Sequence, residues 1–304
     1  MHHKPLMIFN PIANLGRAWP VASNLRRVAD EFGGAVWAGT VYPGHASEIA
    51  EKAASEGYKT VVAVGGDGTI HEVINGLMKV DTAKRPLLGI VPVGSGNDFA
   101  GTMGIPRDSE EALRKVFSGS PRRIDIASAL DGNGRKEYWM NTLGMGFDSA
   151  VNFHSREVPI FQGFMIYFLA LFRTIIENYR PFKITGTIDG ESFEKETLML
   201  TVTNGKREGG GFLLAPDALQ DDGLLNYTLV DVISRLKMLM AIPYFLKGTH
   251  ASLNYVKTGT FKNISLKSNN PLWIHADGEI FAGFSSQVTE LTLEVLPGAI
   301  ELIL

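Results

Sequence analysis

The sequence predicts a chain of two lobes, an α/β lobe with a parallel sheet followed by an antiparallel, β-rich lobe. Over the first 125 residues, short apolar runs alternate with helical patterns, an order that makes neighbouring strands parallel. After Asp125 the pattern changes to β-rich runs, and Asp131-Gly132-Asn133-Gly134 and Asp189-Gly190 are typical of hairpin turns. The 304 residues are at the upper limit for one domain, so two lobes are expected.

The first lobe is expected to place each helix between two strands. Its strands are short and apolar, and the helical patterns between them are about 10–15 residues long. We expect strands at 6–9, 35–41, 60–64 and 87–91, and helices at 17–32, 46–55 and 69–79.

The second lobe is expected to be mostly antiparallel, with two helical insertions. We place the boundaries at 1–126 for the first lobe, completed by the C-terminal segment 296–304, and at 127–295 for the second. Strands are expected at 182–188, 196–203, 224–232, 259–266, 272–275 and 288–295, and helices at about 158–180 and 234–247.

Composition excludes several classes of protein. The chain has 29 basic and 32 acidic residues, a net charge of −3, and nucleic-acid binding over a whole face would need a basic surface. It has no cysteine, which excludes disulfides, thiolate catalysis and cysteine-bound zinc. No signal peptide is visible at the N-terminus, so we expect a protein of the cytoplasm.

A glycine loop follows the third predicted strand. Gly65-Gly66-Asp67-Gly68-Thr69 lets the backbone approach an anion closely, and the helix after it directs its free N–H groups at the loop. A polyphosphate is the ligand that such a loop is best suited to bind. Because a carboxylate repels phosphate, Asp67 indicates a bridging Mg²⁺ or a proton-transfer role; an ordinary strand-to-helix turn is the alternative.

A second loop of the same kind follows the next strand, in the segment PVGSGNDFA at 92–100. Two consecutive loops of this kind would lie side by side at the carboxyl ends of neighbouring parallel strands. Neither loop fits the Walker pattern GxxxxGK[ST] or the dinucleotide pattern GxGxxG.

In this order, GGDGT and PVGSGNDFA resemble the diacylglycerol kinase catalytic-domain family of lipid kinases, which includes the sphingosine and ceramide kinases. Further matching segments follow over almost the whole chain: Asn10-Pro11, Gly44-His45-Ala46, Arg123-Ile124-Asp125, NTLGMGFDSA at 141–150, Asp221-Asp222-Gly223 and Asp277-Gly278-Glu279. The resemblance implies a first lobe similar to NAD kinases and phosphofructokinases, and a β-sandwich-like second lobe.

The resemblance also implies an ATP site on the first lobe and a lipid site on the second. The residues that would line the nucleotide site are Asn10, Thr40, Gly66, Asp67, Gly68, Thr69, Ser95 and Asn97. Asp67, Asp98 and Asp125 would form a carboxylate cluster for Mg²⁺, because converging carboxylates need a cation between them. In the alternative, Asp98 only caps a helix and Asp125 only ends a strand.

Transfer of a phosphoryl group to an alcohol needs an acceptor for the hydroxyl proton. The resemblance gives two candidates, Asp277 and Asp67, of which we favour Asp277, with Glu279 steadying it or the nucleotide. An Asp-Gly pair is also a common hairpin turn, so a purely structural Asp277 stays open. Asp222 matches a structural Mg²⁺ site that would use its carboxylate and the main-chain carbonyls of Leu219 and Leu224.

The segment 158–172 is the most apolar in the chain. It is 15 residues long, and a bilayer span needs about 20. Such a segment is more often core, but beside a kinase site it indicates an acyl-chain pocket or a surface that faces the membrane. The helix at 236–246 is a second candidate wall.

We therefore predict an ATP- and Mg²⁺-dependent lipid kinase that acts at the inner face of the membrane. It would convert diacylglycerol to phosphatidic acid in phospholipid biosynthesis; sphingoid bases and prenyl alcohols stay open as acceptors. The alternatives are a soluble-substrate kinase of the NAD kinase type and a nucleotide-binding regulator without turnover. The sequence leaves a homodimer open.

Overall fold

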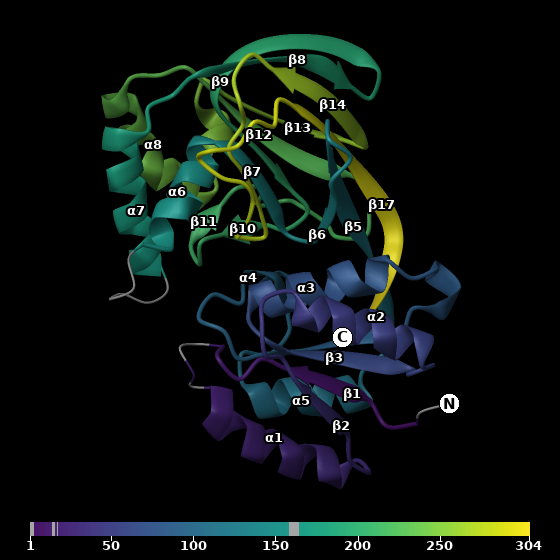
Figure 1. Cartoon of the computed structure of the whole chain (residues 1–304). Helices are drawn as coiled ribbons and strands as arrows, with labels where there is room; N and C mark the ends of the chain where they lie inside the picture. The colour runs from purple at the N-terminus through teal and green to yellow at the C-terminus, as the bar shows by residue number, and fades with distance from the viewer. Residues whose placement is uncertain (1–2, 14–15, 17, 158–163) are drawn as a thin grey trace. The chain divides into compact units, whose positions relative to one another are not determined.

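The computed structural model describes residues 3–13, 16, 18–157 and 164–304, and residues 158–163 of the apolar segment lie outside it. The chain divides into two compact units (Figure 1). Unit 1 comprises Met1–Asp125 and Gly298–Leu304, and unit 2 comprises Ile126–Pro297. The strands β5 (Pro121–Asp131) and β17 (Glu290–Ile303) run through both units.

Unit 1 contains a parallel sheet in the order β17–β4–β3–β1–β2. Its strands are β1 (Leu6–Phe9), β2 (Val36–Gly39), β3 (Thr60–Gly65), β4 (Leu87–Pro92) and the end of β17. Its helices are α1 (Ala18–Glu31), α2 (His45–Ser55), α3 (Asp67–Met78), α4 (Asp98–Thr102) and α5 (Ser109–Ser118), with a 3-10 turn, η1 (Thr82–Lys84).

The helices of unit 1 cover both faces of its sheet. In Figure 1, α1 and α5 lie on one face of the sheet and α2 and α3 on the other. The buried residues of α1 recur every three or four positions (Ala18, Ala22, Leu25, Val28), which is the stripe of a helix with one apolar side. This stripe packs with Met7, Val62 and Leu113 in one core cluster.

Unit 2 is antiparallel, and β9 (Glu191–Thr203) is its central strand. The first half of β9 pairs with β8 (Phe182–Ile188), and its second half pairs with both β7 (Thr142–Gly146) and β12 (Leu225–Asp231). The other strands are β6 (Lys136–Trp139), β10 (Arg207–Glu208), β11 (Phe212–Leu213), β13 (Val256–Phe261), β14 (Asn263–Ser268), β15 (Ile274–Ala276) and β16 (Glu279–Ala282).

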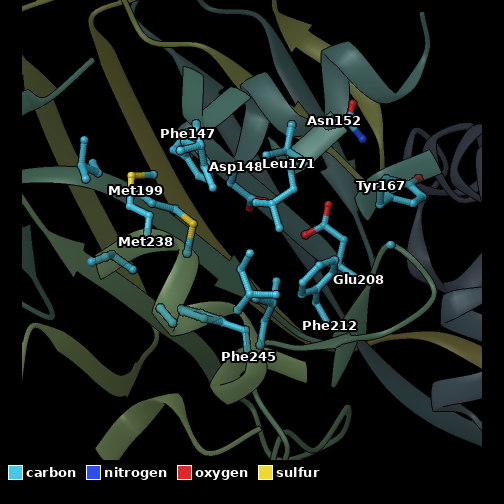
Figure 2. Close-up of a pocket in the computed structure, with 18 of the residues that line it drawn as sticks. Phe147, Asp148, Asn152, Tyr167, Leu171, Met199, Glu208, Phe212, Met238 and Phe245 are labelled. Atoms are coloured by element: carbon cyan, nitrogen blue, oxygen red, sulfur yellow. The ribbon is translucent and has the colours of Figure 1, made fainter. Parts of the chain in front are cut away.

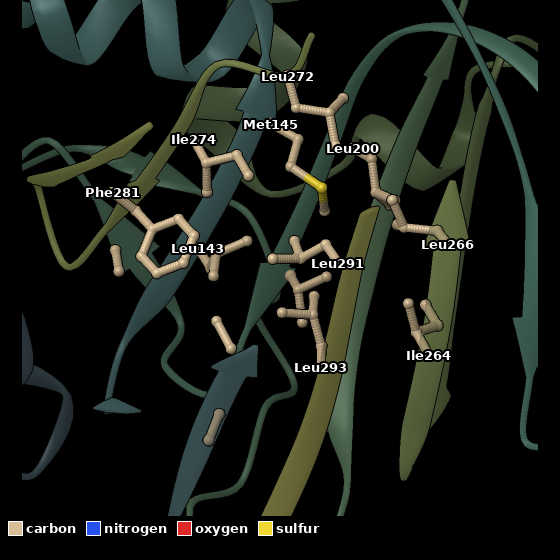
Figure 3. Packing of buried hydrophobic residues seen from close by; sticks show 14 of the residues in the cluster. Leu143, Met145, Leu200, Ile264, Leu266, Leu272, Ile274, Phe281, Leu291 and Leu293 are labelled. Carbon is tan, nitrogen blue, oxygen red and sulfur yellow. The ribbon is translucent and has the colours of Figure 1, made fainter. Parts of the chain in front are cut away.

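The core of unit 2 lies between its strands and is mostly aliphatic, with the aromatic side chains of Trp139, Phe182, Phe261 and Phe281 among its buried members (Figure 3). Leu143, Leu200, Ile264, Ile274 and Leu293 are among its fully or almost fully buried members. A separate cluster joins the helices α6 (Phe147–Ser155), α7 (Phe164–Glu177) and α8 (Arg235–Lys247) to the sheet. A 3-10 turn, η2 (His250–Ser252), follows α8.

The predicted fold class is confirmed: parallel strands come first and antiparallel strands follow. One predicted strand, 259–266, is wrong, because the chain breaks at Lys262 into β13 and β14. The carboxylate of Asp189 accepts the backbone N–H groups of Lys262 and Asn263, at 3.0 and 2.8 Å from Oδ1. Those N–H groups are therefore bound by a side chain at the break.

Candidate active site

The two glycine loops of unit 1 are in contact with each other. A Cβ atom on Gly94 would lie 2.5 Å from the Cα atom of Gly66, and one on Gly66 would lie 3.1 Å from the Cα atom of Gly94. Because β3 and β4 are parallel neighbours, the loops after them meet at one edge of the sheet. The backbones can approach this closely only without side chains, which leaves main-chain N–H groups of both loops beside one another.

Asp67 is the first residue of α3, and its carboxylate holds the N-terminus of α4. Its Oδ2 accepts the N–H of Asp98 and its Oδ1 accepts the N–H of Phe99, both at 3.2 Å. A carboxylate is favoured at a helix N-terminus by the unpaired N–H groups there. The structure therefore joins the two loops through Asp67.

Asn10 and Thr69 stand together at the same edge of the sheet. The Nδ2 atom of Asn10 donates to Oγ1 of Thr69 over 3.1 Å, and Thr69 is buried against Gly65. Thr40 follows β2, and its N–H donates to the carbonyl of Phe9 over 2.9 Å. The residues predicted to bind the nucleotide thus follow β1, β2 and β3.

Asn97 shapes the second loop from within. Its Oδ1 accepts the N–H of Gly94 at 3.1 Å, its Nδ2 donates to the carbonyl of Gly94 at 2.8 Å, and its φ of 57° is left-handed. Ser95 and Gly96 are exposed at the tip of this loop. Ser95 is therefore open to solvent, whereas both polar atoms of Asn97 bind the loop.

In the described structure, Asp67, Asp98 and Asp125 do not all have carboxylate oxygens within 4.8 Å of one another. Asp125 is 1% exposed, and its Oδ1 accepts the N–H of Gly298 at 2.8 Å. In the part of the chain that the structure describes, one group of three carboxylate or imidazole side chains has its ligand atoms within 4.8 Å of one another, and it does not include Asp67, Asp98 or Asp125.

Asp277 and Gly278 form the two-residue turn between β15 and β16. Both have positive φ, 51° and 84°, as a type I′ turn requires. The carboxylate of Asp277 accepts the N–H groups of Met140, Asn141 and Thr142, at 3.0, 2.8 and 3.1 Å. Asp277 is therefore fixed in orientation by the backbone at the start of β7.

The other two predicted carboxylates of unit 2 are those of Glu279 and Asp222. Glu279 pairs with Arg156, whose Nη2 lies 2.8 Å from Oε2. Asp222 is exposed, and its Oδ1 accepts the N–H of Leu224 at 3.0 Å. The side chain of Leu219 in the same loop is 51% exposed.

An apolar pocket lies inside unit 2, between α6, α7, α8 and the sheet (Figure 2). The cavity itself measures about 100 Å³, and the space between its walls, counted out into open solvent, is about 830 Å³. Both helical segments singled out in the sequence contribute walls: Tyr167, Leu171 and Ile175 from α7, and Met238, Ala241, Ile242 and Phe245 from α8. The polar residues Asp148, Asn152 and Glu208 also line it.

Beside this pocket lies a buried group that the sequence analysis missed. His275 Nε2 is 3.1 Å from Oε1 of Glu208 and 3.5 Å from Oδ2 of Asp148, which also accepts the hydroxyl of Thr201 at 2.6 Å. Burial, the largest single influence, lowers the pKa of His275, but Glu208, Asp148 and Asp277 outweigh it and raise the pKa to about 9.

Only part of this group carried a signal in the sequence. Asp148 stands in the segment 141–150, and His275 stands two residues before Asp277. Gly144 pairs with His275 in the sheet, and a Cβ on Gly144 would lie 2.3 Å from both Asp148 Oδ2 and His275 Nε2. Glu208 comes from the short strand β10, which no sequence pattern indicated.

None of the helices that the structure describes is long and apolar enough to cross a membrane. This agrees with the 15-residue apolar segment, which falls short of the length of a bilayer span.

Comparison with models of known families identifies the class of protein. Residues 4–129 match the model of the diacylglycerol kinase catalytic domain, and residues 141–304 match that of the YegS C-terminal NAD kinase beta sandwich-like domain. The chain therefore belongs to the diacylglycerol kinase catalytic-domain family, which confirms the resemblance seen in the sequence.

Individual relatives agree with this assignment. The chain is 33% identical over 260 residues to a protein of Yersinia pestis named probable lipid kinase YegS-like, covering 85% of this chain and 83% of the relative. It is 30% identical over 242 residues to the diacylglycerol kinase of Bacillus subtilis, covering 79% and 77%. A crystal structure of a diacylglycerol kinase from Bacillus anthracis shares the fold, with a TM-score of 0.74, 24% identity, and coverage of 99% and 96%.

Proposed function

We propose that the chain transfers the γ-phosphate of ATP to the hydroxyl of a lipid, with diacylglycerol as acceptor and phosphatidic acid as product. The observation that carries the proposal is the apolar pocket in unit 2, in a chain whose other unit has two glycine loops in contact. A kinase for a small soluble acceptor has no need of a pocket walled by Leu171, Met238 and Phe245.

The nucleotide would bind at the loop edge of unit 1. The N–H groups of the loop at 65–69 and of the loop tip at Ser95 and Gly96 would face its phosphates, and Asn10 and Thr40 would line the site. Mg²⁺ would enter with the phosphates, bind Asp67 and Asp98, and neutralise phosphate charge. Asp125 is buried against Gly298, so we propose for it a structural role.

Two carboxylates are candidates for the acceptor of the lipid hydroxyl proton, Asp277 and Asp67. Both oxygens of each accept backbone N–H groups. Such bonds orient a carboxylate and hold it in place, as a proton acceptor requires. Glu279, paired with Arg156, would stabilise the turn that carries Asp277.

The lipid would reach the pocket from a membrane surface. Four apolar side chains on α7, spaced at i, i+4, i+7 and i+11, are exposed: Met165, Leu169, Phe172 and Ile176. Leu236, Met240 and Tyr244 form a similar exposed row on α8. The pocket is lined by other residues of the same two helices, so one face of each helix would meet the membrane and another would meet the acyl chain.

The charges on α8 also favour contact between this helix and a membrane surface. The helix carries Arg235, Lys237 and Lys247 and no acidic residue. Anionic lipid head groups attract such basic residues at a membrane surface. We therefore propose peripheral contact through the outer face of α7 and α8, defined by the two exposed rows.

The proposal is tested by following labelled phosphate from [γ-³²P]ATP, with Mg²⁺, onto diacylglycerol in mixed micelles. Labelled phosphatidic acid is the expected product. Label appearing instead on a small soluble alcohol would favour a kinase of the NAD kinase type. Measurable ATP binding without transfer to any acceptor in a broad lipid extract would favour a nucleotide-binding regulator.

A further inference from the structure

Three polar side chains gather at one corner of the otherwise apolar pocket. Asp148 and Asn152 are four residues apart on α6 and therefore share one face of the helix, and Glu208 reaches the pocket from β10. Figure 2 shows Asn152 and Glu208 on the same side of the pocket as Tyr167, with Met199 and Met238 on the other side. We call Asp148, Asn152 and Glu208 the polar corner.

Asn152 holds a buried acceptor that none of the described residues uses. Its side chain is 3% exposed, and its Oδ1 has no hydrogen-bond partner in the part of the chain that the structure describes. Leaving a buried polar atom without a partner is unfavourable, so a ligand that supplies one is favoured. A ligand in the pocket that carries a hydrogen-bond donor would satisfy it.

His275 fixes the two carboxylates of the corner but does not suit a metal ion. The N–H of Gly278 faces Nδ1 of His275 at 3.3 Å, so in the neutral ring the proton is on Nε2, which faces Glu208 and Asp148. In the charged ring Nε2 carries a proton as well. A nitrogen that carries a proton has no lone pair for a metal, so the residues favour an ion-paired cluster over a metal site.

The corner therefore offers acceptors to a ligand. Glu208 and Asp148 are carboxylates, and the free atom of Asn152 is a carbonyl oxygen. One imidazolium faces two carboxylates, so the balance of charge at the corner is negative. A hydroxyl or amine can donate to these oxygens, whereas a phosphate or carboxylate head group would meet like charge without compensation.

We propose that the polar corner recognises the head group of the lipid through its hydrogen-bond donors and excludes lipids with anionic head groups. The inference rests on the proposed function, because it takes the pocket to be the acyl-chain site. Excluding anionic lipids would also keep the phosphorylated product from returning to the pocket that bound its precursor.

The test is direct binding of single-chain lipids that share a dodecyl or lauroyl tail, measured by titration calorimetry below their micelle concentrations. Lauroylglycerol represents a hydroxyl head, dodecylamine an amine and dodecyl phosphate an anion. We expect dodecyl phosphate to bind about tenfold or more weakly than lauroylglycerol, a difference of about 1.4 kcal/mol or more. Comparison of lauroylglycerol with dodecylamine identifies which donor is preferred.

Variants connect this preference to the corner. Glu208→Gln keeps the shape and removes one charge, so binding of dodecyl phosphate should improve several-fold. Asn152→Leu removes the amide, so lauroylglycerol should bind about tenfold more weakly. Leu130→Ser, at an exposed residue of β5 that does not line this pocket, is the control and should change neither. Melting temperatures establish that each variant is folded, and Asn152→Ser replaces Asn152→Leu if the latter unfolds.

The results separate this inference from the proposed function. Equal binding of the three head groups, or an unchanged preference in both corner variants, would overturn the inference even if diacylglycerol is phosphorylated. The expected preference without any phosphate transfer to lipid would uphold the inference and overturn the kinase proposal for this acceptor class.

Discussion

The carboxylate of Asp277 accepts the backbone N–H of Asn141 at 2.8 Å, across 136 residues of sequence. With the N–H groups of Met140 and Thr142, this bond ties the β15–β16 hairpin to the chain segment that enters β7. The residue favoured as the catalytic base is thus also a structural link. Any variant of Asp277 tests both roles at once.

Asp277→Asn should therefore lower stability as well as phosphate transfer. Whichever way the amide turns, its NH₂ group faces a backbone N–H, so we expect a loss of about 1–3 kcal/mol in urea unfolding. If Asp277 is the base, the rate per folded molecule should also fall about 10²–10⁴-fold with ATP binding retained.

Asp189→Asn is the matched control, because Asp189 also precedes a glycine in a hairpin turn and also accepts backbone N–H groups, from Lys262 and Asn263. It should lose stability and keep its rate. A normal rate in folded Asp277→Asn would assign the proton to Asp67, and Asp67→Asn should then show the larger loss of rate.

The buried cluster around His275 should make stability depend on pH. The folded protein holds the pKa of His275 at about 9, above its ordinary value of 6.5, because Glu208, Asp148 and Asp277 outweigh burial. The folded state thus binds this proton more tightly, so the contribution is complete below pH 6.5 and disappears as the pH rises to 9. The shift corresponds to about 3 kcal/mol.

The measurement is urea unfolding at intervals from pH 6 to pH 10, with His275→Gln as the variant. Stability of the native chain should fall between pH 6.5 and 9, and the variant should show a flatter profile. His250→Gln is the control, since burial lowers the pKa of His250 and its contribution is lost below pH 6.5 instead. Equal slopes above pH 6.5 in the native chain and His275→Gln would contradict the charged cluster.

The sequence was sufficient for the elements and loops that depend on local pattern. Apolar periodicity located β1, β3 and β4 to within one residue, and the Asp189-Gly190 turn was found because its conformation requires those residue types. The break at Lys262 could not be read in the same way, because its cause is Asp189, more than 70 residues away.

The same distinction holds for the candidate site: contacts between neighbouring strands could be predicted, and contacts between distant segments could not. The contact between Gly66 and Gly94 follows from two parallel neighbouring strands and was expected. The cluster of Asp148, Glu208 and His275 joins a helix, a two-residue strand and a hairpin, and only the folded chain brings them together. Asp125 shows the same limit, because its Oδ1 accepts the N–H of Gly298 at the far end of the chain, a contact that no local pattern indicates.

Gly94→Ala should weaken nucleotide binding strongly with limited loss of stability. The new Cβ would lie 2.5 Å from the Cα atom of Gly66, so the loops would have to separate. We expect ATP affinity to fall about a hundredfold, measured by equilibrium binding, because the N–H groups of both loops would lose their alignment.

Gly101→Ala is the control, since Gly101 lies in α4 with no atom within 4 Å of its Cβ position. It should leave ATP affinity unchanged and raise stability slightly, as alanine does in a helix. Unchanged affinity in Gly94→Ala would place the nucleotide elsewhere in the chain.

The effect of Mg²⁺ on the melting temperature tests the predicted structural ion site in the loop of Asp222. If its carboxylate and the carbonyls of Leu219 and Leu224 hold Mg²⁺, adding the ion should raise the melting temperature of the native chain and not that of Asp222→Ala. Asp217→Ala, at another exposed acid of unit 2, should behave as the native chain does. If adding Mg²⁺ leaves the melting temperature of the native chain unchanged, the predicted structural Mg²⁺ site at Asp222 is contradicted.

The outer face of α7 and α8 should decide how much protein binds to membranes. Ile176 and Met240 are 71% and 62% exposed, and neither lines the pocket. The double variant Ile176→Ser/Met240→Ser should therefore reduce pelleting with anionic phospholipid vesicles several-fold, because each side chain contributes about 1.5–3 kcal/mol when fully buried in apolar surroundings.

Activity toward a short-chain diacylglycerol dissolved below its micelle concentration should stay normal in the double variant, since the pocket is unchanged. Val41→Ser, at a 78% exposed apolar residue of unit 1, is the matched control and should pellet as the native chain does. If the double variant pellets normally, contact with the membrane does not depend on this face, and if it loses soluble-lipid activity as well, the two residues support the pocket and not the surface.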